Sequence, residues 1–114
     1  MPIKIIHGIY TGNEVMEEAQ DFKDYIIEKH EKFNRKYDQD FVVFSVGIDL
    51  IHKLKTIAVV HAFDIFDPDI AKEIIEGRMA RMLGELEWED EGGIVHRTPY
   101  DPLPDYIKVI NYSY

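Results

Sequence analysis

The chain has 114 residues, a hydrophobic fraction of 46%, no cysteine and a formal net charge of −9. This length predicts a single domain over residues 1–114, with enough apolar content to bury a core. The composition excludes disulfides, thiolate metal sites and cysteine nucleophiles, and the acidic balance disfavours binding to duplex DNA or RNA. Because the chain opens without a signal-peptide pattern and no apolar run approaches the roughly 20 residues that span a bilayer, we expect a soluble cytoplasmic protein without membrane association.

The first two elements are expected to be a strand and a long helix. Residues 3–10 alternate, with Ile3, Ile5, His7 and Ile9 on one side. Thr11 and Glu14 have the spacing of a capping box, which predicts a helix start. One apolar stripe then continues for several turns, widened by Tyr25 and Ile27, and its members are Val15, Ala19, Phe22, Ile26, His30, Phe33 and Tyr37. We interpret His30 as a packed residue of this stripe, because no second metal ligand stands one turn away.

A β-hairpin is expected over residues 40–66, and the rest of the chain is interpreted as its cover or connection. The large apolar residues of the first strand are Val42, Phe44, Val46, Ile48 and Leu50, and the matching face of the second strand carries Ile57, Val59, His61, Phe63 and Ile65. A turn centred on His52 and Lys53 would pair Val46 with Val59, Ile48 with Ile57, Phe44 with His61 and Val42 with Phe63. Since His-Lys is not a favoured two-residue turn, we expect a longer loop.

The opposite face of this hairpin carries small residues. They are Ser45, Gly47, Ala58 and Ala62, and Val43 and Val60 flank them. This face is either a half-exposed side of the sheet or a surface for another protomer or a flat ligand.

A second helix is expected from residue 68 to about residue 86. Asp67 is a favourable N-cap and Pro68 a favourable first residue. One stripe contains Ala71, Ile75, Met79, Met82 and Leu86, while Ile70, Ile74 and Leu83 broaden it and suggest burial on more than one side. Gly77 lies in the helix interior, where glycine is less stable than alanine by about 1 kcal/mol. It either permits the close approach of another backbone or is simply tolerated.

The remaining residues predict short strands around turns. Gly92-Gly93 breaks the chain after the acidic run 85–91, residues 94–98 are compatible with a short strand, and residues 106–114 are expected to form the last strand. The complete order is β-α-β-β-α-β, which predicts an α+β fold. We expect an antiparallel sheet with both helices on its large-residue face, in a ferredoxin-like arrangement.

The chain lacks the motifs of the common enzyme classes, and we expect it not to be an enzyme. His96-Arg97-Thr98 is a His-x-Thr triplet, but a phosphoesterase of that type needs a second one and none is present. His7, His61 and His96 would hold zinc only if they converged, and we interpret them as packed residues. Asp64 and Asp67 lie near a strand end, and Asp67 is already explained as a helix cap. We therefore expect no metal and no cofactor.

Two alternative binding sites remain. Arg78 and Arg81 lie one turn apart on the second helix, and arginine forks onto phosphate while tyrosine stacks on bases. The expected site for a small anionic ligand comprises Arg78, Arg81, His96, Arg97 and Tyr100. The helix arginines would alternatively pair with Glu73, Glu76 and Glu85. The second candidate site is the acidic segment Glu87, Trp88, Glu89 and Asp90, in which Trp88 would anchor a protein partner and the acids would steer it.

The segment from Thr56 to Leu83 resembles a pattern of small phage-encoded accessory proteins. The segment makes up about a quarter of the chain, and its matching residues are Ala58, Ala62, Asp64, Phe66, Gly77, Arg78 and Arg81, whereas Pro68-Asp69 departs from the pattern. The resemblance implies an oligomeric sponge that sequesters a nucleotide signal of host immunity, similar to anti-Thoeris and anti-CBASS proteins, acting in the host cytoplasm. The first hypothesis is thus an oligomeric, non-enzymatic protein that binds a small phosphorylated ligand. The alternative is an acidic inhibitor that binds a host protein through residues 85–91.

Overall fold

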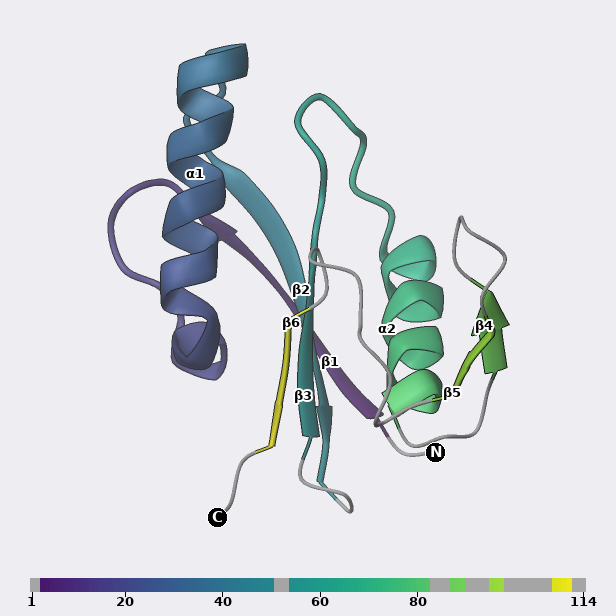
Figure 1. The fold of residues 1–114 in the computed structure, drawn as a ribbon. Helices are drawn as coiled ribbons and strands as arrows, with labels where there is room; N and C mark the ends of the chain where they lie inside the picture. Colours follow the sequence, from purple (N-terminus) through teal and green to yellow (C-terminus); the bar gives the residue numbers. More distant parts are fainter. Residues whose placement is uncertain (1–2, 51–53, 83–86, 90–94, 98–107, 112–114) are drawn as a thin grey trace.

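An antiparallel four-stranded sheet forms the centre of the molecule, in the order β1-β2-β3-β6 (Figure 1). Its strands are β1 (Ile3–Tyr10), β2 (Val42–Asp49), β3 (Leu54–Val59) and β6 (Lys108–Asn111). The computed structural model describes residues 3–50, 54–82, 87–89, 95–97 and 108–111, and it describes side chains in 3–50 and 54–80.

Three helical segments and a second, small sheet complete the described structure. The helical segments are the 3-10 helix η1 (Glu17–Phe22), α1 (Lys23–Tyr37) and α2 (Pro68–Met82). The small sheet pairs β4 (Glu87–Glu89) with β5 (Val95–Arg97). The expected α+β class is confirmed, and so are the first strand and the short strand near residue 95. None of the described helices is long and apolar enough to cross a bilayer.

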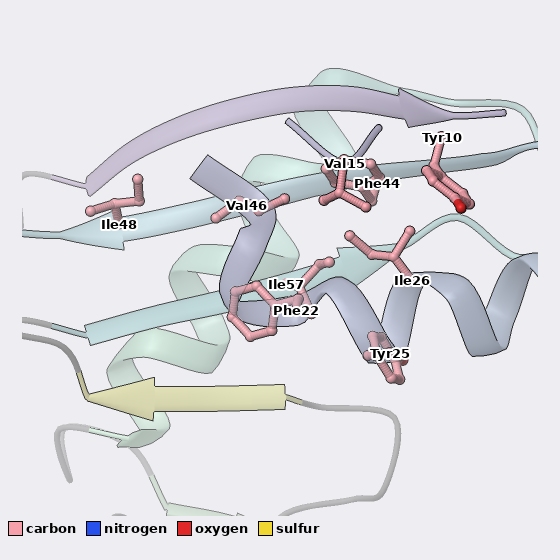
Figure 2. Packing of buried hydrophobic residues seen from close by; sticks show 10 residues of the cluster. Tyr10, Val15, Phe22, Tyr25, Ile26, Phe44, Val46, Ile48 and Ile57 are labelled. Atoms are coloured by element: carbon pink, nitrogen blue, oxygen red, sulfur yellow. The ribbon is translucent and has the colours of Figure 1, made fainter. Parts of the chain in front are cut away.

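The large apolar residues of the sheet pack against η1 and α1, where they form the main core (Figure 2). Phe44 and Val46 of β2 and Ile57 of β3 are almost fully buried there, together with Phe22 and Ile26. This contact follows from the sequence, because the alternating face of the hairpin meets the apolar stripe of the first helix.

Helix α2 covers the opposite face of the sheet, so the expectation of two helices on one face is wrong (Figure 1). Gly47 lies directly under α2, since a Cβ added there would stand 2.2 Å from the Ile75 side chain. Small residues on β2 and β3 do not leave this face bare. They allow the backbone of α2 to approach closely. The ferredoxin-like arrangement is not formed either, because β1 and β2 are direct antiparallel neighbours rather than strands of a split βαβ unit.

The hairpin has the expected faces but a different register. Phe44 pairs with Val59, Val46 with Ile57 and Ile48 with Lys55, which is two residues from the expected pairing. A shift of two keeps every side chain on its face, so the alternation alone cannot distinguish the two registers. Four residues separate the last pair, Asp49 and Leu54, and the expectation of a longer loop is confirmed.

The second hairpin strand ends at Val59 instead of continuing to residue 65, so the expected pairing of Phe44 with His61 and of Val42 with Phe63 is wrong. One further backbone bond joins the Val60 amide to the Val43 carbonyl, and the chain then turns at Ala62 and Phe63. We refer to residues 60–67, between β3 and α2, as the crossing segment. Its alternation of apolar residues resembles a strand, but the side chains lie largely on the surface.

The two predicted helix starts have different outcomes. Asp67 caps α2 as expected: its Oδ1 accepts the backbone N–H of Asp69 at 2.9 Å and that of Ile70 at 3.4 Å. The capping box at Thr11 and Glu14 is wrong, because the first helical turn begins only at Glu17 and no side chain caps it. The apolar residue Val15 is nevertheless buried as expected, since the chain packs onto the sheet before the helix begins.

Candidate recognition surface

Two adjoining hollows lie where the crossing segment spans the sheet. The large hollow has a volume of about 620 Å³ and lies between the sheet, the crossing segment and the first turns of α2. The small hollow has a volume of about 350 Å³ and lies between the crossing segment and residues 38–43. The two share Val60, His61, Phe63 and Asp64, so they form one continuous surface. We call the lining residues of both hollows together the recognition surface.

This surface gathers most of the exposed apolar side chains of the described residues. Five of the seven large apolar residues that are exposed line the two hollows, namely Phe41, Phe63, Ile65, Ile70 and Ile74. Phe63 is 72% exposed and Ile65 is 93% exposed. Single exposed apolar residues are ordinary on a protein surface, but a contiguous group indicates an interaction site.

The recognition surface is bordered by carboxylates. Asp38 and Asp40 line the small hollow, Asp67 lines the large one and Asp64 lines both. No lysine or arginine occurs among the described residues that line either hollow. The local field is therefore negative, with the same sign as the net charge of the chain.

Gln39 holds the backbone at Phe63, the residue with the exposed ring. The Gln39 side chain is buried, its amide donates to the Phe41 carbonyl, and its Oε1 accepts the backbone N–H of Phe63; both distances are 3.0 Å. The turn is closed by the Asp64 amide, which donates to the His61 carbonyl at 3.1 Å. Phe63 has a φ of 69°, in the left-handed region that an aromatic residue rarely adopts. A strained backbone held by a buried amide often marks a functional position.

Aromatic contacts attach the crossing segment to the end of α1. The His61 ring lies 5.8 Å from that of Phe33 and 6.0 Å from that of Tyr37, and Tyr37 lies 5.6 Å from Phe63. The recognition surface thus has a firm support on the α1 side, although its rings remain largely exposed. Binding there would require little reordering of the backbone.

A buried hydroxyl forms part of the floor of the large hollow. Ser45 is 1% exposed, and its Oγ shares a hydrogen bond of 2.7 Å with Nδ1 of His7. The ring of His7 packs edge-on against Phe66, 4.9 Å between centroids. Among the described residues no carboxylate contacts His7, so the Ser-His-acid arrangement of a hydrolase is not formed there. We interpret the contact with His7 as the hydrogen bond that the buried hydroxyl of Ser45 needs.

Arg78, the first residue of the expected anion site, makes a structural contact. Its guanidinium donates to the carbonyl of Ile57 at 2.7 Å, and the side chain is partly buried. It also acts electrostatically on Tyr25 of α1, a buried residue of the main core. Burial raises the pKa of Tyr25 above its ordinary value, the nearby Arg78 opposes this increase, and Glu28 adds to it. Arg78 therefore joins α2 to the backbone of β3.

The other described residues of the two predicted sites lie at the end of α2 and on the small sheet, and the structure describes only their backbone. Arg81 lies in α2, one turn after Arg78, and His96 and Arg97 lie in β5. Tyr100 and Asp90 fall outside the described residues. The register opposes Glu87 with Arg97, Trp88 with His96 and Glu89 with Val95, so residues of the two alternative sites stand on paired strands. Opposite charges at a cross-strand pair are a favourable arrangement.

The predicted histidine and aspartate candidates do not form a metal site in the described part of the chain. No group of three potential ligands gathers there. His30, expected as a packed residue, bonds to Asp40 at 2.8 Å and contacts the Tyr10 ring edge-on. Asp64 and Asp67 instead form part of the border of the hollows.

The recognition surface itself was not predicted, although one signal for it exists. Phe63 and Ile65 continue the alternation of the second strand, which predicts burial in the hairpin. Ile70 and Ile74 lie outside the stripe that contains Ala71 and Ile75, and the resulting width of the apolar face of α2 does predict a second apolar contact.

Comparisons with family models, with curated proteins and with solved structures each gave no match for this chain.

Proposed function

We propose that the chain is a non-enzymatic binding protein that uses the recognition surface to hold another protein. The proposal is carried by one observation: the exposed apolar side chains of the described residues are concentrated in two adjoining hollows. Specific interfaces have an apolar centre in which aromatic and aliphatic side chains anchor the partner, surrounded by a polar rim. Phe63 and Ile65 would be such anchors.

The chemistry of the partner is inferred from charge. Four aspartates border the surface and no cation does, among the residues that the structure describes. A partner with lysines or arginines around an apolar patch would be attracted and oriented, while an acidic one would be repelled. A phosphorylated molecule is poorly matched to these hollows for the same reason.

The shape favours an amphipathic segment. A volume of about 620 Å³ exceeds that of one side chain and is open along the first turns of α2. An amphipathic helix presents several apolar residues along one stripe and is a common occupant of such grooves. The inferred partner is therefore a basic amphipathic segment of another protein.

Two synthetic helical peptides test this function, and they share a leucine face but carry either lysines or glutamates on the polar face. We expect the lysine peptide to bind in calorimetry and the glutamate peptide not to bind. Binding should weaken with salt, because the charged rim is exposed. Equal binding of the two peptides, or binding of neither, would contradict the proposal.

A matched pair of variants locates the contact. Ile65→Asp changes a side chain that is 93% exposed, so the protein should remain folded. The affinity for the lysine peptide should decrease by about tenfold or more. Leu50→Asp is the control, since Leu50 is also exposed, at 52%, but lies in the hairpin turn outside both hollows. Loss of binding in the control alone would place the contact elsewhere. The same assay with Trp88→Ala tests the alternative contact through the acidic segment 85–91.

The small phosphorylated ligand remains a second proposal, together with the oligomeric phage anti-defence role that the resemblance implies. It is supported by the placement of Arg78 and Arg81 one turn apart on α2. Native mass spectrometry of the purified protein, followed by titration with a cyclic dinucleotide, tests it. A bound mass that Arg81→Gln removes would support this function, whereas no bound mass and no heat of binding would eliminate it.

A further inference from the structure

In the described part of the chain, the outer edge of β1 is the long edge of the sheet that has no neighbouring strand. Among the described residues β1 has a single partner strand, β2, with which it forms eight consecutive pairs without a bulge. Only Tyr10 of its eight residues is buried, whereas seven of the eight residues of β2 are. At the other end of the sheet, β6 has four residues. A long, regular strand at an edge offers unpaired backbone groups to another strand.

β1 has little of the usual protection of such an edge. Natural edge strands are protected by charged side chains such as lysine, by proline, by a bulge or by being very short. β1 has the sequence IKIIHGIY, in which Lys4 is the one formal charge at neutral pH and four residues are isoleucine. This composition favours pairing with a further strand rather than exposure to water.

Charge distribution indicates that the partner strand belongs to a second copy of the chain. Two copies each carry a net charge of −9 and repel each other over most of their surfaces. The recognition surface is a poor place for a second copy, because its aspartates would meet the same aspartates. β1 contains no carboxylate, so two β1 strands can approach without placing acids opposite each other.

We propose that two copies of this chain pair β1 with β1, antiparallel, so that one sheet continues through both. Such an interface is isologous, as in most homodimers. To keep the α1 faces on one side, a residue must lie opposite one of equal parity. A pairing centred on Ile6 satisfies this condition, because it places Ile6 opposite Ile6, Ile3 opposite Ile9 and Lys4 opposite Gly8. It therefore covers Ile9, an exposed apolar residue outside the two hollows.

The dimer would have a functional consequence, which rests on the proposed function. Antiparallel pairing across an edge keeps the same face of both sheets on one side, so the two recognition surfaces would open in the same direction. A partner with two basic segments would then bind with an avidity above that of one site. The dimer itself is tested without any partner, so its failure is separate from failure of the proposed function.

The first experiment measures mass in solution by light scattering after size exclusion. We expect twice the mass of one chain for the wild type and a shift to one chain for Ile9→Lys, because a lysine there would replace the apolar contact of Ile9 with Ile3 of the other copy by a charge at both ends of the paired segment. Ile65→Lys is the matched control and should remain a dimer, since Ile65 lies in the crossing segment. A monomeric wild type, or an Ile9→Lys variant that stays dimeric, would overturn the proposal.

The second experiment fixes the register, using the absence of native cysteine. Ile6→Cys should form a disulfide between two copies under mild oxidation, because directly opposite Cβ atoms lie about 4.5–5.5 Å apart. Lys4→Cys should not, since its counterpart would lie at the far end of the paired segment. Equal cross-linking of the two variants on a non-reducing gel would contradict the pairing centred on Ile6.

Discussion

The two faces of the central sheet are built from residues of different size and covered to different extents. On the α1 face Phe44, Val46 and Ile57 are almost fully buried under η1 and α1. On the α2 face the small residue Gly47 is covered by α2. Two further small residues of this face, Ser45 and Ala58, line the large hollow instead. The difference suggests that the α1 face supplies most of the stability, while the α2 face combines a close helix contact with a surface left for recognition.

The largest expected effect is on the α1 face. Phe44→Ala removes a ring that is 1% exposed and leaves a cavity that the rigid sheet cannot fill. We expect a loss of about 3–5 kcal/mol in the free energy of unfolding. Urea denaturation followed by circular dichroism measures it. A loss below about 0.5 kcal/mol, the range typical of a surface position, would mean that this face is not the main core.

A smaller loss is expected where α2 approaches the sheet. In Gly47→Ala the new Cβ would stand 2.2 Å from Cγ2 of Ile75, so the helix or its side chain must shift. We expect a loss of about 1–3 kcal/mol from overpacking. A double-mutant cycle with Ile75→Ala checks the cause, because the loss at Gly47 should largely disappear when Ile75 is already truncated. Strict additivity would indicate a different cause.

A glycine-to-alanine substitution within α2 should stabilise the protein, in contrast to Gly47→Ala. Among the described residues, a Cβ at Gly77 meets nothing within 4 Å beyond its own helix, so no described segment depends on this glycine for a close approach. We expect Gly77→Ala to raise the free energy of unfolding by about 1 kcal/mol. Thermal denaturation beside the wild type measures the change. A destabilised variant would show that α2 has a neighbour at this position.

The smallest effect concerns Tyr25, at the border where Arg78 of α2 acts on the α1 side. Burial raises the pKa of Tyr25 in the folded protein, so its contribution to stability is complete below the ordinary pKa of 10.0 and is lost as pH rises through the folded-state value. Wild type should therefore lose stability more steeply above this pH than Tyr25→Phe. Parallel pH curves from urea denaturation would contradict the assignment.

Sequence patterns predicted the parts of the fold that depend on face and periodicity. The apolar stripe of α1, the Asp67 cap of α2 and the two faces of the hairpin each follow from local rules. The register of the hairpin was wrong because alternation repeats every two residues. The side of the sheet that α2 covers was wrong because small residues are compatible with both an open face and a close helix.

The recognition surface could not be predicted for a related reason. The apolar residues of the crossing segment keep the alternation of a strand, and only the turn at Phe63 removes them from the hairpin. That turn depends on Gln39, which lies 24 positions earlier in the sequence and has no local signature. The predicted anion site combined Arg78 and Arg81 of one helix with His96, Arg97 and Tyr100 of a later segment. Its first residue, Arg78, bonds to the Ile57 carbonyl.

The left-handed backbone of Phe63 has a consequence for engineering and for sequence drift. A glycine or asparagine would adopt this conformation with less strain, so replacing Phe63 should increase thermal stability while deleting the most prominent ring of the surface. Selection for stability alone, in a laboratory or in a lineage that has lost its partner, would therefore remove Phe63 early. Retention of an aromatic residue at position 63 among stabilised variants would then report that binding is still under selection.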